Sequence, residues 1–209
     1  MTVTIAIDGP AAAGKGTLAR RLAAALDLPY LDTGLLYRAV ARRVLDAGAD
    51  PADPASAESA ARGLQAADLA RDDLRGPIAD AAASKVAGHP AVRAALMDFQ
   101  RGFAAEGAIL DGRDIGTVIL PNARVKLFVV ADVDARAKRR WREMQDRGAD
   151  IPLEQVAADL ARRDAQDAER LAAPLRQAGD AIVLDTTHLD ADAAFARALE
   201  IVRYRLGSA

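Results

Sequence analysis

The sequence contains no cysteine, and aromatic residues make up only 4% of its 209 positions. The absence of cysteine excludes disulfide bonds and thiol chemistry. Histidine occurs only at His89 and His188, which is too little for a histidine-based metal cluster. No run approaches the roughly 18 apolar residues of a membrane-spanning helix, and the N-terminus shows no signal-peptide pattern. We therefore expect a cytoplasmic protein with no membrane partner.

Excess charge of either sign is also missing, because 28 Lys and Arg residues face 30 Asp and Glu residues. The formal net charge of −2 lacks the overall basicity of a non-specific nucleic-acid binder, so we expect no nucleic-acid partner. Only four of the 28 basic residues are lysine, which leaves 24 arginines. The planar arginine fork binds phosphate in a bidentate way and stays protonated. Acidic substrates must therefore be bound by local groups of arginine.

The apolar pattern predicts an α/β fold. Short, β-branched runs at 3–7, 108–110, 125–130 and 181–184 read as strands, and each ends at or shortly before an aspartate. Alanine-rich stretches with helical spacing, such as Leu18, Leu22 and Leu26, lie between them. This order indicates a parallel sheet with helices on both faces. Residues 49–61, interrupted by Pro51 and Pro54, are predicted to form a loop leading into a helix.

A glycine-rich loop joins the first predicted strand to the first predicted helix. Residues 8–17 read Asp-Gly-Pro-Ala-Ala-Ala-Gly-Lys-Gly-Thr. Glycines permit the tight turn, backbone N–H groups and the helix N-terminus attract phosphate oxygens, and Lys15 reaches the β and γ phosphates. A plain glycine turn would not require a lysine beside the second glycine. The predicted phosphate-binding residues are Gly9, Pro10, Ala11, Ala12, Ala13, Gly14, Lys15, Gly16 and Thr17.

The loop departs from the usual pattern at its magnesium ligand. The hydroxyl that normally follows the lysine is replaced by Gly16, and a hydroxyl appears one place later at Thr17. Mg²⁺ is commonly held through substrate phosphates and water, so we expect little direct protein ligation. Asp111, at the end of a predicted strand, is the candidate to orient these waters, and a helix or turn cap is the alternative role.

Further motifs narrow the prediction. They are Asp32-Thr33-Gly34 with Tyr37-Arg38, Ser84, Arg93, the Asp-Gly-Arg-Asp-Ile-Gly-Thr run at 111–117, Arg163-Asp164, Asp167, Arg170, Ala173-Pro174-Leu175 and Leu184-Asp185-Thr186-Thr187. With the Gly-Lys-Gly-Thr loop, they resemble the bacterial cytidylate kinases, a family of P-loop nucleoside monophosphate kinases, over nearly the whole chain. The resemblance implies ATP as phosphoryl donor, Mg²⁺, and CMP or dCMP as acceptor.

The same resemblance implies a single P-loop kinase domain that consists of three parts. The core is expected at about 1–31, 107–132 and 171–209, the NMP-binding part at about 32–106 and a helical lid at about 133–170. Between Leu64 and Ile78 the chain is too short and too polar for the β-hairpin insertion usual in the family, so the NMP-binding subdomain is expected to be reduced. We expect a monomer with small nucleotides as its partners.

The resemblance also implies individual roles. Lys15, Arg113, Arg163 and Arg170 are the expected catalytic residues. Arg136 is expected to flank the adenine of ATP, and Arg140 to touch its phosphates. The CMP-binding residues are expected to be Thr33, Tyr37, Arg38, Ser84, Arg93, Arg113, Asp114, Arg163, Asp167 and Arg170.

The base-reading assignment agrees with the chemistry of cytosine. A carboxylate such as Asp114 accepts from the N4 amino group, and an arginine such as Arg93 donates to N3 and O2. Uracil presents an acceptor at position 4 instead. Other readings of the implied residues stay open: Tyr37 as a packed helix residue, and the Arg163–Asp167–Arg170 series as a surface ion-pair ladder. The arginines of 136–147 could equally form the i,i+4 pairs of a solvated helix.

Two other functions remain possible at this point. The first is a kinase of the same fold that acts on AMP, UMP or a polyol. The second is a nucleotide-dependent switch. A guanine-reading switch would need an Asn-Lys-x-Asp motif, but the single asparagine, Asn122, is followed by Ala123.

Overall fold

A computed structural model describes residues 2–170 and 172–207 of the chain. It divides into two compact units. The first, here called the core unit, contains the residues up to Leu31 and those from Ala104 onward. The second, here called the inserted unit, is Asp32–Phe103.

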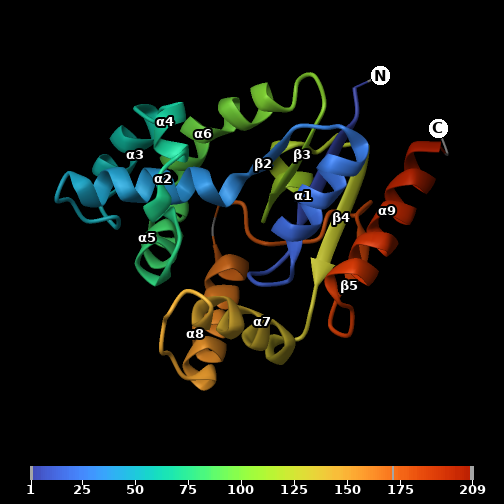
Figure 1. The fold of residues 1–209 in the computed structure, drawn as a ribbon. Helices are drawn as coiled ribbons and strands as arrows, with labels where there is room; N and C mark the ends of the chain where they lie inside the picture. The colour runs from blue at the N-terminus through green and yellow to red at the C-terminus, as the bar shows by residue number, and fades with distance from the viewer. Residues whose placement is uncertain (1, 171, 208–209) are drawn as a thin grey trace. The chain divides into compact units, whose positions relative to one another are not determined.

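The sheet of the described residues has five strands in the order β2-β3-β1-β4-β5 (Figure 1). The strands are β1 (Thr4–Asp8), β2 (Tyr30–Asp32), β3 (Ala108–Gly112), β4 (Val125–Val130) and β5 (Ile182–Asp185). The pairs β1–β3, β1–β4 and β4–β5 are parallel, and Ile7 at the end of β1 lies opposite Asp111 and Leu127. Because the carboxyl ends of parallel strands share one edge, residues that follow β1 and β3 meet there.

Helices flank this sheet, which confirms the predicted α/β class. The helices of the core unit are α1 (Lys15–Leu26), α7 (Val133–Gln145), α8 (Leu153–Glu169) and α9 (Ala191–Gly207). α1 buries Leu18 and Leu22, and it lies beside α9 (Figure 1). A single π-helical turn, η2 (Ile115–Ile119), follows β3 and packs against β1.

The pair α7 and α8 is fastened to the glycine-rich loop by an apolar cluster of its own. Ala11 of the loop packs with Ala137 of α7 and with Val156 and Leu160 of α8, all of them buried. α7 and α8 also pack on each other (Figure 1). A displacement of either helix would therefore also shift the loop, because close-packed side chains transmit such displacements.

The inserted unit is helical. Its elements are α2 (Thr33–Asp46), α3 (Pro54–Arg62), α4 (Ala66–Leu69), a 3₁₀ turn η1 (Asp72–Leu74), α5 (Pro77–Ala87) and α6 (Pro90–Phe103). α2 packs on α5, and α3 packs on α6 (Figure 1). Asp53 caps α3 by accepting from the backbone N–H of Ser56 at 3.0 Å, so the predicted loop-to-helix transition at 49–61 is confirmed. The segment between Leu64 and Ile78 forms the two short helical elements α4 and η1.

The strand β2 was not predicted, because its three residues are too few to display a period of two. Across residues 2–170 and 172–207, no helix has both the length and the apolar character needed to cross a membrane.

Candidate active site

The glycine-rich loop has the turn geometry that its sequence predicts. β1 ends at Asp8, and α1 begins at Lys15. Gly9, Ala12 and Gly14 adopt positive φ values of 148°, 59° and 89°. A Cβ atom at Gly9 would overlap the carbonyl oxygen of Val129 on β4, so this position has no room for a side chain. The loop is thus held close against the sheet at the point where α1 starts.

Lys15 is the buried cation of this loop. Its side chain is only 5% exposed, and Nζ donates a hydrogen bond to the carbonyl oxygen of Pro10 at 2.7 Å. Burial lowers the pKa of Lys15 well below its usual value, and the positive charges of Arg113 and Arg163 lower it further, while nearby carboxylates oppose them. Arg113 and Arg163, which come from separate parts of the sequence, therefore both lie close enough to repel Lys15. Such a site favours an anion.

Asp111 faces the start of α1. It is buried on β3, and Oδ1 accepts a hydrogen bond from the Tyr30 hydroxyl at 2.9 Å. A Cβ atom at Gly16 would lie 3.8 Å from Oδ2 of Asp111 and 3.5 Å from the Tyr30 hydroxyl, so the missing side chain keeps this space open. Asp111 is a strand residue that Tyr30 orients, and its role toward the waters of Mg²⁺ stays a prediction. The sequence pattern did not indicate Tyr30.

Asp8 was not predicted as a site residue, although it organises the run 111–117. Its carboxylate accepts from the backbone N–H groups of Ile115 at 2.8 Å and Gly116 at 2.7 Å. Burial raises the pKa of Asp8 to about 6, although the two N–H groups oppose this effect. A Cβ atom at Gly116 would lie 3.3 Å from Oδ2 of Asp8, so a small residue suits this position. The carboxylate at the end of β1 therefore fixes the segment that directly follows Arg113 and Asp114.

A buried carboxylate links two of the predicted arginines. Asp167 is 4% exposed and accepts from Nε of Arg113 at 2.6 Å and from Nη2 of Arg170. Arg163 and Asp167 lie on α8, and Arg170 directly follows the end of the helix. Because Asp167 is buried and also holds Arg113, the group is not a solvated surface ladder.

Arg136 joins the loop to α8. Its side chain is almost fully buried, Nε donates to the carbonyl of Ala131 at 2.8 Å, and Nη1 donates to the carbonyl of Ala11 at 3.2 Å. Both terminal nitrogens also bind the carboxylate of Asp164, at 3.1 and 2.6 Å. In this state the guanidinium contacts protein groups, and the expected position beside adenine stays a prediction. Asp164 had been noted only as part of the Arg-Asp motif.

Of the other lid arginines, Arg147 forms the i,i+4 pair with Glu143 at 2.8 Å, which is one of the pairs left open above, whereas Arg139 and Arg140 make different contacts. Arg139 donates to Oγ1 of Thr186 at 3.0 Å and to the carbonyl of Leu189 at 3.2 Å. Thr186 in turn donates to the carbonyl of Ala13 in the glycine-rich loop at 3.1 Å. Arg140 pairs with Glu143 at 2.8 Å, and its contact with phosphate stays a prediction. The segment after β5 therefore also supports the loop.

Five of the predicted acceptor residues belong to the inserted unit. Thr33 is buried at the start of α2, and the Arg93 guanidinium lies over the ring of Tyr37, 5.4 Å from its centroid. Arg93 is 6% exposed and donates to the carbonyl of Ala87 at 3.3 Å. Tyr37 is thus both packed and in contact with another predicted acceptor residue.

The remaining two, Arg38 on α2 and Ser84 on α5, both contact Asp80. Nε of Arg38 donates to the Asp80 carboxylate at 2.9 Å, and the Ser84 hydroxyl donates to the Asp80 carbonyl at 3.1 Å. Asp80 had not been predicted. Asp114 lies in the core unit, where it is 5% exposed and its charge contributes to the raised pKa of Asp8.

Comparison with known proteins gives a consistent result. Residues 5–204 match the family described as cytidylate kinase. The chain is 63% identical over 201 residues to the cytidylate kinase of Acidiphilium cryptum (strain JF-5), covering 96% of this chain and 95% of that protein. It is 62% identical over 204 residues to the cytidylate kinase of Granulibacter bethesdensis (strain ATCC BAA-1260 / CGDNIH1), covering 97% and 98%.

Solved structures share the fold. An uncharacterized protein from Eubacterium ventriosum ATCC 27560 gives a TM-score of 0.58 at 16% identity and covers 100% of both chains. TT1252 from Thermus thermophilus gives a TM-score of 0.50 at 24% identity and covers 98% of both chains. The family assignment itself rests on the sequence matches, which span nearly the whole chain. The chain belongs to the cytidylate kinase family.

Proposed function

We propose that the protein transfers the γ-phosphoryl group of ATP reversibly to CMP or dCMP, which gives ADP and CDP or dCDP. Family membership over residues 5–204 and the name shared by its relatives support the reaction. The observation that carries the chemistry is the electrostatic grouping of Lys15 with Arg113 and Arg163. A reaction between two phosphate-bearing substrates requires such a concentration of positive charge.

The donor side of the proposed site is the glycine-rich loop. Residues 9–17 and the N-terminus of α1 would bind the ATP phosphates, with Lys15 exchanging its contact to Pro10 for a phosphate oxygen. A bound anion also offsets the burial cost that lowers the pKa of Lys15. Arg136 and Arg140 are kept as proposed ATP contacts, with the loop carbonyl and Asp164 as the present partners of Arg136.

Magnesium fits the donor side if the substrate supplies most of the ligands. Among the described residues, no group of three or more His, Cys, Asp or Glu side chains could hold a metal ion. Asp111 beside Gly16 offers one oriented carboxylate, and Thr17 offers a hydroxyl at the start of α1. These residues would position waters of a phosphate-bound ion. When bound, Mg²⁺ would neutralise charge on the β and γ phosphates.

The acceptor side is proposed to use Thr33, Tyr37 and Arg38 with Arg113, Arg163, Asp167 and Arg170 for the sugar and monophosphate. Ser84, Arg93 and Asp114 are proposed to read the base. Since the Ser84 hydroxyl donates to the Asp80 carbonyl, its lone pairs are left to accept from an amino group such as cytosine N4. Asp114 would accept from the same group.

The chemical step needs no protein nucleophile. A phosphate oxygen of CMP attacks the γ phosphorus, a new O–P bond forms, and the bond to the oxygen bridging the β and γ phosphorus atoms of ATP breaks to release ADP. Lys15, Arg113, Arg163 and Arg170 reduce repulsion between the anions and stabilise the charge on the transferring group. Asp167 holds Arg113 and Arg170 in place, and closure of α7 and α8 would exclude water from the donor.

Steady-state assays of ADP release test the proposal. The panel contains CMP, dCMP, UMP, AMP and GMP, and a reaction without acceptor measures hydrolysis. We expect turnover with CMP and dCMP far above the rest. The highest activity on AMP or UMP would reassign the acceptor, and equal ADP release without any acceptor would overturn the kinase proposal.

A substitution tests the base-reading residues. Asp114→Ala should reduce the preference for CMP over UMP by about 10-fold, because the variant no longer penalises the acceptor O4 of uracil with an unpaired carboxylate. The KM for ATP should change little. Unchanged selectivity would show that Asp114 does not read the base.

A further inference from the structure

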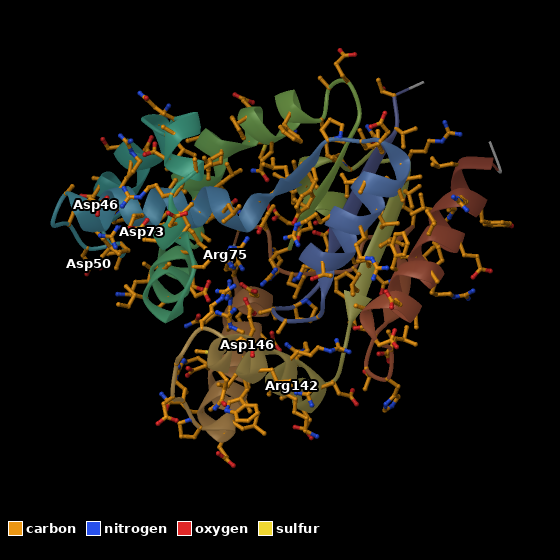
Figure 2. The ribbon with its side chains drawn as sticks, viewed as in Figure 1. Asp46, Asp50, Asp73, Arg75, Arg142 and Asp146 are labelled. Carbon is orange, nitrogen blue, oxygen red and sulfur yellow. The ribbon has the colours of Figure 1, made fainter. Side chains whose placement is uncertain are left out.

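The inserted unit contains a largely buried ion pair between Arg38 and Asp80. Nε of Arg38 on α2 binds Oδ1 of Asp80 on α5 at 2.9 Å, and the two side chains are only 16% and 15% exposed. In contrast, Arg71 pairs with Asp46 and Asp73 at the surface, where exposures are 34–44% (Figure 2). Surface pairs of this second kind contribute little. The Arg38–Asp80 pair is shielded and therefore better able to fix an orientation.

Within the described part of the chain, the contact with Asp80 leaves one terminal nitrogen of the Arg38 guanidinium without a hydrogen bond. Among the described residues, the buried Nη1 atom has no hydrogen-bond partner, and the Asp32 carboxylate lies 4.0 Å from it. Asp32 itself also pairs with Arg75, at 3.5 Å. A buried charged N–H group without an acceptor is costly, and an oxygen of a bound anion would satisfy it. Asp80 therefore binds Nε of Arg38, and Nη1 of Arg38 remains available to a bound anion.

Asp80 also connects the two kinds of acceptor group within the inserted unit. Its carboxylate orients Arg38, which is assigned to the monophosphate, and its carbonyl accepts from Ser84, which is assigned to the base. The carbonyl contact is the ordinary i to i−4 bond of a helical serine, so the specific contribution of Asp80 lies in its carboxylate.

We propose that Asp80 is a positioning residue of the acceptor site, which holds Arg38 by Nε so that Nη1 is presented to the monophosphate of CMP. The proposal rests on the proposed function and extends it, because Asp80 itself does not contact substrate. A rotatable arginine would lose this orientation each time the site empties, and ordering it would then weaken CMP binding.

The competing role for the same carboxylate makes the opposite prediction. If Asp80 merely neutralised Arg38 and had to be displaced by the phosphate, removing its charge would strengthen CMP binding. If the pair only supported the fold, substitutions would lower thermal stability without a selective change in the KM for CMP. The sign and selectivity of the KM change thus separate the three roles.

The experiment compares Asp80→Ala with Asp80→Asn. We expect Asp80→Ala to raise the KM for CMP about 10-fold, equivalent to about 1.4 kcal/mol, with the KM for ATP unchanged. Asp80→Asn keeps an oxygen that accepts from Nε, so its KM for CMP should stay within about 3-fold of wild type. Asp80→Ser serves as the second removal variant if Asp80→Ala does not fold.

A double variant and a matched control complete the test. Since Asp80 acts through Arg38, the variant carrying both Arg38→Ala and Asp80→Ala should be no worse than Arg38→Ala alone. Asp68→Ala removes another carboxylate of the inserted unit, which is also 15% exposed and pairs with Arg43 at 2.9 Å. It should lower the melting temperature without raising the KM for CMP.

The outcomes distinguish this proposal from the proposed function. A wild-type protein that gives no CMP-dependent turnover overturns both. If wild type phosphorylates CMP, the inference alone is overturned by an unchanged or lower KM for CMP in folded Asp80→Ala or Asp80→Ser, by an equal rise in the KM values for CMP and ATP, or by additive effects in the double variant.

Discussion

Protonation of Asp8 should make folding stability depend on pH between about pH 4 and pH 6, and Asp8→Asn should remove this contribution. The Asp8 carboxylate is buried, and its pKa is raised from 3.8 to about 6. The folded protein therefore binds this proton at a higher pH than the unfolded chain. The contribution of Asp8 to folding stability should therefore fall as pH rises from about 4 to about 6, and stay level above that.

The size of the effect follows from the shift. A pKa raised by about two units corresponds to about 3 kcal/mol, of which about 1.4 kcal/mol should develop between pH 8 and pH 5. The ionised form carries this cost because burial removes the carboxylate from water, and the N–H groups of Ile115 and Gly116 offset it only in part. The asparagine of Asp8→Asn has no titrating group.

Urea unfolding at several pH values measures the difference. The unfolding free energy of wild type minus that of Asp8→Asn should increase by about 1.4 kcal/mol on acidification from pH 8 to pH 5. Asp53→Asn provides a control whose difference from wild type should not vary between pH 8 and pH 5, because hydrogen bonds from Ser56 lower the pKa of the exposed Asp53 and it stays ionised over this range. A difference for Asp8→Asn that does not vary with pH, or that decreases on acidification, would refute the assignment of Asp8 as a buried, ionising carboxylate.

Three further substitutions test the loop and the lid. Lys15→Ala should lower kcat at least about 100-fold with little change in melting temperature, and near-normal turnover would contradict the role of Lys15. The control Lys85→Ala removes a surface partner of Asp50 (Figure 2) and should leave kcat unchanged. Arg136→Lys should lower the unfolding free energy measured in urea by about 2 kcal/mol, since lysine cannot reproduce the forked contacts to Asp164 and Ala11, while Arg162→Lys at the exposed Arg162–Asp159 pair should have no measurable effect. Gly9→Ala should destabilise the fold by at least about 2 kcal/mol in the same assay, because its Cβ would overlap the Val129 carbonyl, and wild-type stability would contradict the loop geometry.

The parts of the structure that depend on local sequence were predictable. β1, the loop and α1 follow one another within 26 residues, and each has its own signal in apolar pattern, glycine spacing and helical period. The four longer strands were predicted for the same reason. β2 was missed because Tyr30, Leu31 and Asp32 form a strand through their neighbours rather than through a pattern of their own.

The contacts that hold the site together were harder to predict from the sequence. Arg136 finds Asp164 at a sequence separation of 28, and Arg113 finds Asp167 at a separation of 54. Propensity and period contain no information about such partners, so the sequence alone left i,i+4 pairs as an equal alternative, and of these the Arg147–Glu143 pair forms. Arg139 instead donates to the Thr186 hydroxyl and to the Leu189 carbonyl in the segment after β5. Asp8 and Asp80 were missed likewise, because their partners come from other elements.

The central claim is that phosphate passes from ATP to CMP and not to water. Phosphorus NMR of one reaction containing protein, Mg²⁺, ATP and CMP measures this directly. We predict that CDP appears in equal amount to ADP without inorganic phosphate, and that ADP mixed with CDP regenerates ATP and CMP. Inorganic phosphate accumulating in place of CDP would contradict the account.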